Sequence, residues 1–224
     1  NPQEVGFEQM QDNARSVVVS GDNAYVAVGL TGLAVVNITD PENPQEVGHY
    51  DSLANTYRIT ISGDNAYINV SFRWPLDNNC GLQVISIADP ENPEEAGFCN
   101  TDGTPNDIAI SGDFAYVTVA GLQVISIADP DNPEVVGYCD ARGDECSVTV
   151  SGEFAYVAVT STGISDGGLR VISVADPENP VVVGSIDTPM DARDVAVSGD
   201  FAYVADDRHD LSVISIADPE NPVE

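Results

Sequence analysis

One short pattern, Ser-Gly-Asp/Glu-x-Ala-Tyr-Val/Ile, occurs five times in this chain of 224 residues. Each copy is followed by an apolar run and then by Asp-Pro-Glu/Asp-Asn-Pro, and the copies begin at Ser20, Ser62, Ser111, Ser151 and Ser198. Repeats of about 40 to 50 residues are typical of four-stranded propeller blades. Such units cannot bury their apolar faces alone. The period therefore predicts one domain, residues 1–224, built from five similar units.

Each repeat contains four short β-rich runs separated by turn residues. In the first repeat these runs cover residues 16–21, 23–28, 33–39 and 45–50. Glycine, proline, aspartate and asparagine separate them, as tight turns require. The second and third runs are almost continuously apolar, which is typical of a sheet packed on both faces. We predict an all-β, five-bladed β-propeller of four-stranded antiparallel blades, with repeat cores starting near Ser16, Arg58, Asp107, Ser147 and Asp194.

The first residues of the chain match the fourth run of the other repeats. The segment Gln3, Glu4, Val5, Gly6 and Phe7 corresponds to Gln45-Glu-Val-Gly-His, and the last repeat ends where its own fourth run should begin. We predict that this N-terminal strand completes the last blade and covers its open edge. The recipient is either the same chain or a second copy, since both placements make the same hydrogen bonds. Donation to a second copy would build a head-to-tail filament.

The third run of each repeat carries a family resemblance. Gly-Leu-Gln-Val-Ile-Ser-Ile-Ala-Asp-Pro begins at Gly81 and again at Gly121, after Ala-Tyr-Val in the second run. The chain resembles the LVIVD-repeat family, β-propellers of bacterial and archaeal cell-surface proteins. The final Asp of that family motif is replaced here by serine or asparagine, at Asn37, Ser86, Ser126, Ser173 and Ser215. The resemblance implies an extracellular or cell-surface location and carries no catalytic residue over to this chain.

The leading functional hypothesis is therefore a non-enzymatic structural or interaction module outside the cell. Its partner would be another protein, its own copies in a filament, or a surface glycan. No apolar run reaches the roughly 18 residues of a membrane span, so we expect none.

Charge is the second strong signal. Thirty-seven acidic residues face seven arginines and no lysine, for a formal net charge of −30. Nucleic-acid binding needs a basic surface, so we expect no nucleic-acid partner. Like charges repel one another in the compact state unless cations screen them. A halophilic or cation-rich setting follows as a hypothesis.

This charge predicts a salt-dependent stability. The melting temperature should rise as NaCl is increased from low to molar concentration, because screening weakens carboxylate repulsion in the folded chain. Differential scanning calorimetry at constant pH measures the effect, with sucrose as a control for non-ionic stabilisation. A flat response to NaCl would remove the halophilic hypothesis.

The four cysteines predict two disulfides. Cys80 begins a third run and Cys99 ends the next fourth run, so an antiparallel hairpin would place them opposite one another. Cys139 and Cys146 flank a short link between two repeats. We predict the pairs Cys80–Cys99 and Cys139–Cys146, as expected in an oxidising compartment.

The longest insertion supports an alternative function. Residues 71–80 contain the only tryptophan, and Phe72, Arg73, Trp74 and Asp77 lie together there. An exposed tryptophan beside polar groups can stack on a sugar ring or anchor a protein. The alternative is thus a glycan-binding propeller that uses the Trp74 loop. Loss of glycan-array binding in Trp74→Ala would favour it.

A third hypothesis is a glycoside hydrolase at the mouth of the central channel. The start of each first run places Asp107 and Asp194 in equivalent positions, with Arg58 and Arg193 nearby. Glycosidases use two carboxyl groups about 5–9.5 Å apart. A neighbouring arginine would instead lower the pKa of a carboxyl. We expect no enzymatic activity, no metal site and no cofactor beyond weakly bound Ca²⁺ or other cations.

Overall fold

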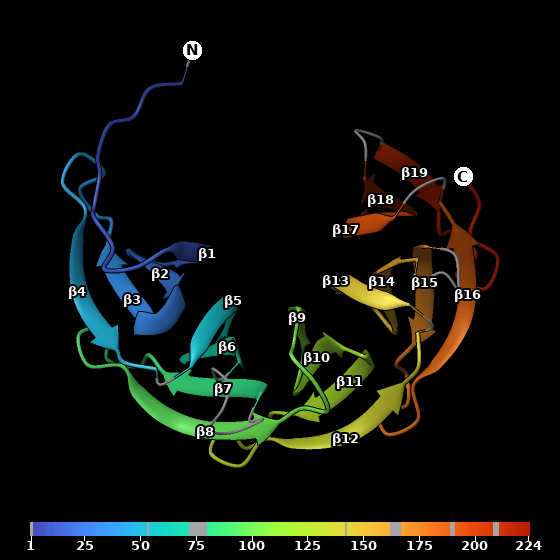
Figure 1. Cartoon of the computed structure of the whole chain (residues 1–224), viewed down its shortest axis with the longest axis horizontal. Coiled ribbons are helices and arrows are strands. Elements are labelled where there is room, and N and C mark those ends of the chain that lie inside the picture. The colour runs from blue at the N-terminus through green and yellow to red at the C-terminus, as the bar shows by residue number, and fades with distance from the viewer. Residues whose placement is uncertain are drawn as a thin grey trace. The chain divides into compact units, whose positions relative to one another are not determined.

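The computed structural model describes residues 2–52, 54–71, 80–141, 143–161, 167–188, 191–207 and 211–224, without the side chain of Glu145. It contains two compact units. The first comprises residues 1–100 with 130–132, and the second comprises residues 101–129 and 133–224. Five antiparallel β-sheets make up these units, and their strands follow chain order within each sheet (Figure 1). The predicted all-β class is confirmed.

The first unit holds two four-stranded sheets. Their strand orders are β1-β2-β3-β4 and β5-β6-β7-β8. The strands of the first sheet are β1 (Ala14–Ser20), β2 (Asn23–Val28), β3 (Gly32–Asn37) and β4 (Gln45–Tyr50), with a 3-10 turn, η1 (Gly29–Thr31), between β2 and β3. Those of the second sheet are β5 (Asn55–Ser62), β6 (Asn65–Ser71), β7 (Cys80–Ser86) and β8 (Glu94–Asn100).

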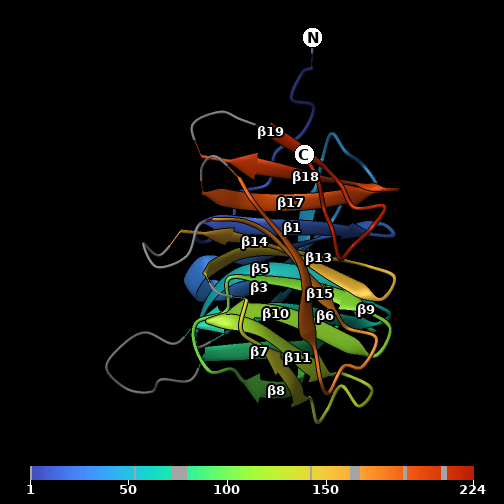
Figure 2. The ribbon, with the colours of Figure 1, turned by 90° about the vertical axis from the view of Figure 1, so that its right-hand side faces the viewer.

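The second unit holds three sheets, of which two have four strands. These are β9 (Asp107–Ser111), β10 (Phe114–Val119), β11 (Gly121–Ser126) and β12 (Glu134–Cys139), and then β13 (Asp144–Ser151), β14 (Phe154–Thr160), β15 (Gly168–Ser173) and β16 (Val181–Asp187). The last sheet has three strands, β17 (Ala192–Ser198), β18 (Phe201–Asp206) and β19 (Leu211–Ser215), which lie side by side in Figure 2.

The first two strands of every sheet are joined by a two-residue turn. In the first repeat Ser20 pairs with Asn23, which leaves Gly21 and Asp22 in the turn. Gly21 has a φ of 58°, and the glycines at the same place in the other repeats have φ between 57° and 60°. Glycine adopts this left-handed conformation without the steric cost of a β-carbon. The repeated Ser-Gly therefore sets the hairpin geometry locally.

The Asp-Pro-Glu-Asn-Pro segment forms a second turn that its own aspartate stabilises. Asp40 Oδ1 accepts a hydrogen bond from the Glu42 amide at 3.1 Å, and Oδ2 accepts one from the Asn43 side chain at 2.9 Å. Equivalent pairs of bonds recur at Asp89, Asp176 and Asp218. The Asn43 bond is the main cause of a lowered Asp40 pKa, followed by the bond from Glu42. These acids serve turn formation.

The fourth strands β4, β12 and β16 also rest on the turn of the next sheet. A β-carbon placed on Gly48 would lie 2.0 Å from the carbonyl oxygen of Pro90, and one on Gly184 would lie 2.1 Å from that of Pro219. Only glycine permits this approach of two backbones. The ladder of β3 and β4 has a bulge beside this glycine, between Val35 and Val36, and the other fourth strands share it.

The hydrophobic cores lie between neighbouring sheets. In the first unit Tyr25, Leu33 and Val35 of the first sheet pack with Ile59 and Ile68 of the second. In the second unit β10 and β11 pack against β13 and β14 in the same way, and β14 and β15 pack against β17 and β18. Both faces of an internal sheet are thus buried, as the continuous apolar runs predicted.

Candidate functional site

Two of the predicted carboxylates, Asp107 and Asp194, meet at one serine in the second unit. The Ser147 hydroxyl oxygen lies 2.9 Å from Asp107 Oδ2 and 2.7 Å from Asp194 Oδ1. Asp107 Oδ2 also accepts a hydrogen bond from the Val148 amide at 3.0 Å. The three side chains come from β9, β13 and β17, which are the first strands of three neighbouring sheets. The repeat thus places one polar group per sheet at the same level.

This arrangement fills the space that a glycosidase leaves open. Ser147 is 3% exposed, and its hydroxyl stands between the two carboxylates. A glycosidase needs the scissile oxygen and a water in that place. Because a hydroxyl has one proton, Ser147 donates to one carboxylate at a time. The cluster therefore links three neighbouring sheets through hydrogen bonds.

Ser147→Ala should lower the free energy of unfolding by about 1.5–3 kcal/mol, the usual range for a hydrogen bond to a charged group. Ser16→Ala is the matched control, since Ser16 occupies the same repeat position and its hydroxyl oxygen accepts a long bond from the Ile59 amide at 3.4 Å. The Ser16→Ala substitution should lower the free energy of unfolding by less than about 1 kcal/mol. Urea unfolding measures both values. Equal losses would show that Ser147 does not link the carboxylates energetically.

β-Bulges turn the preceding residues of these strands toward one another. The register shifts between Glu145 and Ser147 and between Ala192 and Asp194, which places Cys146 and Arg193 in the bulges. In the first unit the bulge residue Arg15 lies over the ring of Tyr57, 5.1 Å from its centroid. Arg58 is exposed on β5. Position in the repeat places Arg15, Cys146 and Arg193 at equivalent points of their strands. The bulges decide which way their side chains point.

Cys146 and Arg193 line a cavity of about 640 Å³ in the second unit. Its other lining residues are Gly103, Thr104, Asn106, Val119, Ala120, Asp144 and Thr160. Arg193 donates to both carboxylate oxygens of Asp207, at 2.9 and 2.7 Å, and lies 4.0 Å from Asp191. The bonds to Asp207 raise the Arg193 pKa. Asp207 and Asp191, which the sequence had not singled out, are thus the ion-pair partners of Arg193.

Burial raises the pKa of the Cys146 thiol above its ordinary value. The adjacent Arg193 acts in the opposite direction, and Asp144 and Asp191 add to the rise. Since the thiolate is the reactive species, this thiol is a poor nucleophile at neutral pH.

We expect iodoacetamide to alkylate Cys146 slowly at neutral pH and faster above about pH 9, where thiols ionise. Arg193→Gln should slow the reaction further, because it removes the charge that favours the thiolate. Arg170→Gln, in the same unit but at a different cavity, is the control and should leave the rate unchanged. Mass spectrometry of the Cys146 peptide gives the rates, and faster alkylation in Arg193→Gln would contradict the assignment.

The two predicted disulfides do not form in this structure, where all four cysteines are thiols. The register of β7 and β8 pairs Cys99 with Leu82 and Asn100 with Gly81, so Cys80 lies beyond the position opposite Cys99. Cys139 lines a different cavity, of about 520 Å³, together with Tyr138 and Arg170. Cys146 lines the first cavity, and the pairing of Cys139 with Cys146 stays a prediction.

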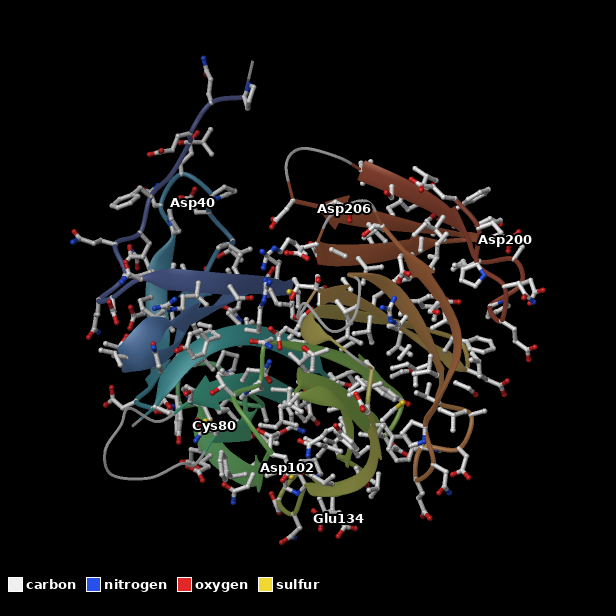
Figure 3. The ribbon with its side chains drawn as sticks, turned by 45° about the vertical axis from the view of Figure 1, so that its right-hand side comes forward. Asp40, Cys80, Asp102, Glu134, Asp200 and Asp206 are labelled. Carbon is white, nitrogen blue, oxygen red and sulfur yellow. The ribbon has the colours of Figure 1, made fainter. Side chains whose placement is uncertain are left out.

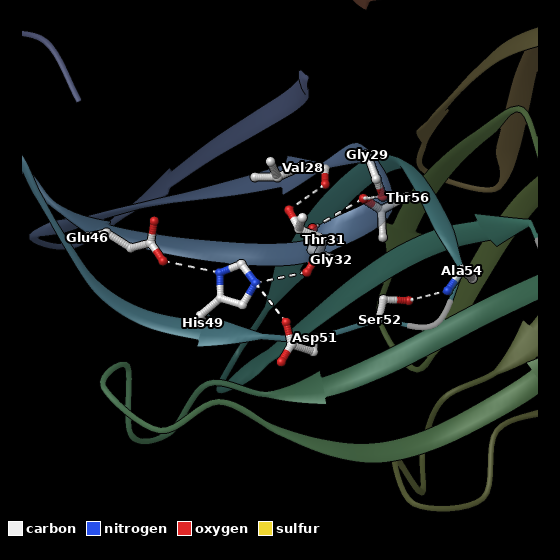
Figure 4. Close-up of polar contacts among 10 residues, drawn as sticks. All are labelled: Val28, Gly29, Thr31, Gly32, Glu46, His49, Asp51, Ser52, Ala54 and Thr56. Carbon is white, nitrogen blue, oxygen red and sulfur yellow. Dashed lines mark hydrogen bonds and ion pairs between the residues drawn. The ribbon is translucent and has the colours of Figure 1, made fainter. Parts of the chain in front are cut away.

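Histidine 49 has a role that the sequence did not reveal. Its Nδ1 lies 3.1 Å from Glu46 Oε1, and its Nε2 lies 2.9 Å from the Thr31 carbonyl and 3.3 Å from Asp51 Oδ1 (Figure 4). The ring thus ties β4 to the turn that precedes β3. Across the described residues no group of three or more histidine, cysteine or acidic side chains is arranged to hold a metal ion.

The acidic turn at Asp200 precedes β18. Asp200 and Asp206 stand at opposite ends of β18 (Figure 3), and Asp206 Oδ2 accepts a hydrogen bond from Ser212 at 3.1 Å.

The predicted glycan-binding residues Phe72, Arg73, Trp74 and Asp77 lie outside the described residues. The structure has no helix, in the parts it describes, of sufficient length and hydrophobicity to cross a membrane.

The structure does not confirm the predicted N-terminal strand as the fourth strand of the last sheet, which has three strands among the described residues. Gln3 to Phe7 lie outside the assigned strands, and β19 gains only a bridge between Ser215 and Val223 on its outer edge within the described residues. Yet a β-carbon on Gly6 would lie 2.0 Å from the Pro41 carbonyl oxygen. This is the contact that the fourth-strand glycines Gly48 and Gly184 make with their prolines.

Comparison with known protein families finds the same five repeats in this chain. A family model described as the LVIVD repeat matches residues 12–52, 55–101, 102–141, 142–188 and 189–224. The chain belongs to the LVIVD repeat family. Each match covers one of the five sheets, so the resemblance seen in the sequence is confirmed. The five LVIVD repeats fit a propeller-like arrangement.

Solved structures share the fold at low sequence identity. A functionally unknown protein from Desulfotomaculum acetoxidans DSM 771 has 16% identity and a TM-score of 0.78, over 96% of this chain and 70% of that one. The computationally designed Ika8 protein has 12% identity and a TM-score of 0.71, over 95% of this chain. This LVIVD chain spans 61% of the length of Ika8. No curated protein sequence matches it.

Proposed function

We propose that this LVIVD repeat chain is a non-enzymatic structural module outside the cell that joins copies of itself head to tail. In this proposal the N-terminal strand of one copy completes the last sheet of another. The contact between Gly6 and Pro41 carries the proposal, because it seats the segment as the fourth strand of a sheet that would precede the first.

Donor and acceptor both have unpaired backbone. Val5 and Phe7 beside Gly6 are exposed, and the segment lies outside the assigned strands. On the acceptor side, the described part of β19 pairs outward only at Ser215. An exposed strand edge is a template for an added strand. Addition from a second copy uses different surfaces on the two copies, so the contact is heterologous. Further copies can then add at each end of the assembly.

The register of the other sheets specifies the pairing. Asn37 of β3 pairs with Gln45 of β4, and Gln3 is the counterpart of Gln45. Gln3 would therefore face Ser215, a position that Val223 occupies in this structure. The donated strand must displace Val223, so residues 222–224 compete with it.

A non-enzymatic role is supported by the placement of Ser147 between Asp107 and Asp194. A location outside the cell is supported by the formal charge of −30, which suits a salt-screened setting. A hydrolase alternative would require turnover that disappears in Asp107→Ala or Asp194→Ala.

Sedimentation analysis and electron microscopy of three forms test the proposal. The full chain should associate with rising concentration, and deletion of residues 1–9 should weaken association at least tenfold. Deletion of residues 222–224 should strengthen it, because the competing bridge is lost. A synthetic peptide of residues 1–9 should block assembly of the full chain. A strictly monomeric full chain, with a deletion that lowers only the melting temperature, would overturn strand donation between copies.

A further inference from the structure

The repeat exposes at its ends the surfaces that it buries inside each unit. In three places within the units, the tyrosine, leucine and valine of one sheet pack against the first strand of the next sheet. Tyr25, Leu33 and Val35 contact the cluster that contains Ile59, and Tyr156, Leu169 and Val171 contact the cluster that contains Val195. Tyr116, Leu122 and Val124 share a cluster with Val148 in the same way.

The last sheet presents these side chains to solvent. Tyr203, Leu211 and Val213 are 36%, 64% and 43% exposed, whereas Tyr156, Leu169 and Val171 at the same repeat positions are 4%, 0% and 0% exposed. Phe201 beside them is also exposed, although its counterpart Phe154 packs on the core. We name Phe201, Tyr203, Leu211 and Val213 the last face.

The first sheet presents the complementary half. Val17 and Val19 of β1 are 59% and 60% exposed. Val148 and Val195, the counterparts of Val17, are 5% and 6% exposed, and Val150 and Val197, the counterparts of Val19, are partly buried, since the preceding sheet covers them. We name Val17 and Val19 the first face. The two faces together contain the residue types that form every sheet-to-sheet core described above.

We propose that the last face of one copy docks on the first face of a second copy. The internal sheets supply the evidence for complementarity, since the same side chains already pack in this way three times within the chain. Burial of contiguous apolar surface is the driving force. Docking would also bring the segment seated on Pro41 beside the edge of the sheet that carries the last face, so the inference rests on the proposed function and names its contact surface.

The geometry predicts polarity and salt dependence. The contact is heterologous, so each copy keeps one face for a further neighbour and the chain of copies extends. Two copies that each carry a charge of −30 repel one another at low ionic strength. Association should therefore strengthen with NaCl, as screening reduces the repulsion.

Complementary face variants test the inference by sedimentation at 0.5 M NaCl. One variant combines Val17→Glu with Val19→Glu, and the other combines Leu211→Glu with Val213→Glu. Each alone should be monomeric, with association at least 100-fold weaker than that of the unchanged chain. An equimolar mixture should form a dimer and stop there, because one intact pair of faces remains. Val181→Glu is the control, since Val181 is an exposed valine on the outer strand β16, outside both faces.

The outcomes separate this inference from strand donation. Undiminished association of the face variants, or a mixture that stays monomeric, overturns the face contact. If the face variants lose association and the chain without residues 1–9 keeps it, the face contact stands and strand donation fails. A full chain that is monomeric at every concentration overturns both. Circular dichroism confirms folding, and Val17→Ser and Leu211→Ser replace any variant that does not fold.

Discussion

Replacing Leu169 by alanine is expected to lower the free energy of unfolding by about 2–5 kcal/mol, the range for a buried leucine that leaves a cavity. Leu169 is 0% exposed on β15, where it belongs to the core between the fourth and fifth sheets. Its removal takes dispersion contacts from both sheets, and a close-packed sheet interface cannot collapse fully around the gap. Guanidinium unfolding at two protein concentrations gives the value.

Leu211→Ala is the matched control for that experiment. Leu211 occupies the same repeat position on β19 but is 64% exposed. Its replacement should change stability by less than about 0.5 kcal/mol at concentrations where the chain is monomeric, as surface substitutions usually do. A loss equal to that of Leu169→Ala would mean that Leu211 is covered in the monomer, which contradicts the exposed last face.

Gly137→Ala is expected to cost about 3 kcal/mol, the upper end for overpacking. An added β-carbon would lie 2.1 Å from the Pro177 carbonyl oxygen and 3.0 Å from Pro180 Cδ. Both contacts belong to a turn whose position is set by Asp176, so β12 must move away from the neighbouring sheet. Thermal unfolding of the purified variant measures the effect.

Gly103→Ala is the control for this substitution. Among the described residues other than its chain neighbours, no atom lies within 4 Å of an added β-carbon at Gly103, and its φ is outside the left-handed region. We expect a change within about 0.5 kcal/mol. Similar losses at Gly103 and Gly137 would show that glycine is required for chain flexibility, and that the approach of β12 to the turn is not the cause.

The strands and turns were predictable because their causes are local. The runs 23–28 and 45–50 became β2 and β4 with the expected bounds. Gly21 adopts the positive φ that a two-residue hairpin needs, and Asp40 satisfies the backbone of its own turn. Neither requires a distant partner, so the repeat could be read from residue types alone.

The strand register at the cysteines and the position of the N-terminal segment were not predictable in this way. The hairpin suggested that Cys80 faces Cys99, but the register pairs Leu82 with Cys99, two residues from Cys80, and the bulge between Val84 and Ile85 contributes one residue of this offset. The likeness of Gln3–Phe7 to a fourth strand predicted pairing with the last sheet, whereas in the structure this segment lies outside the assigned strands and brings Gly6 against Pro41. Bulges and contacts between sheets depend on packing, which residue types do not specify.

The sequence alone determined the five repeats, the all-β class and the polar group at the start of each first strand. Only the tertiary structure decided that Ser147 joins Asp107 to Asp194, and that Arg193 pairs with Asp207. It also decided that Leu169 is buried while Leu211 is exposed. Repeated residues have the same intrinsic preferences, but burial and ion pairing depend on which neighbours lie within contact distance, and the ends of a repeat have different neighbours from its middle.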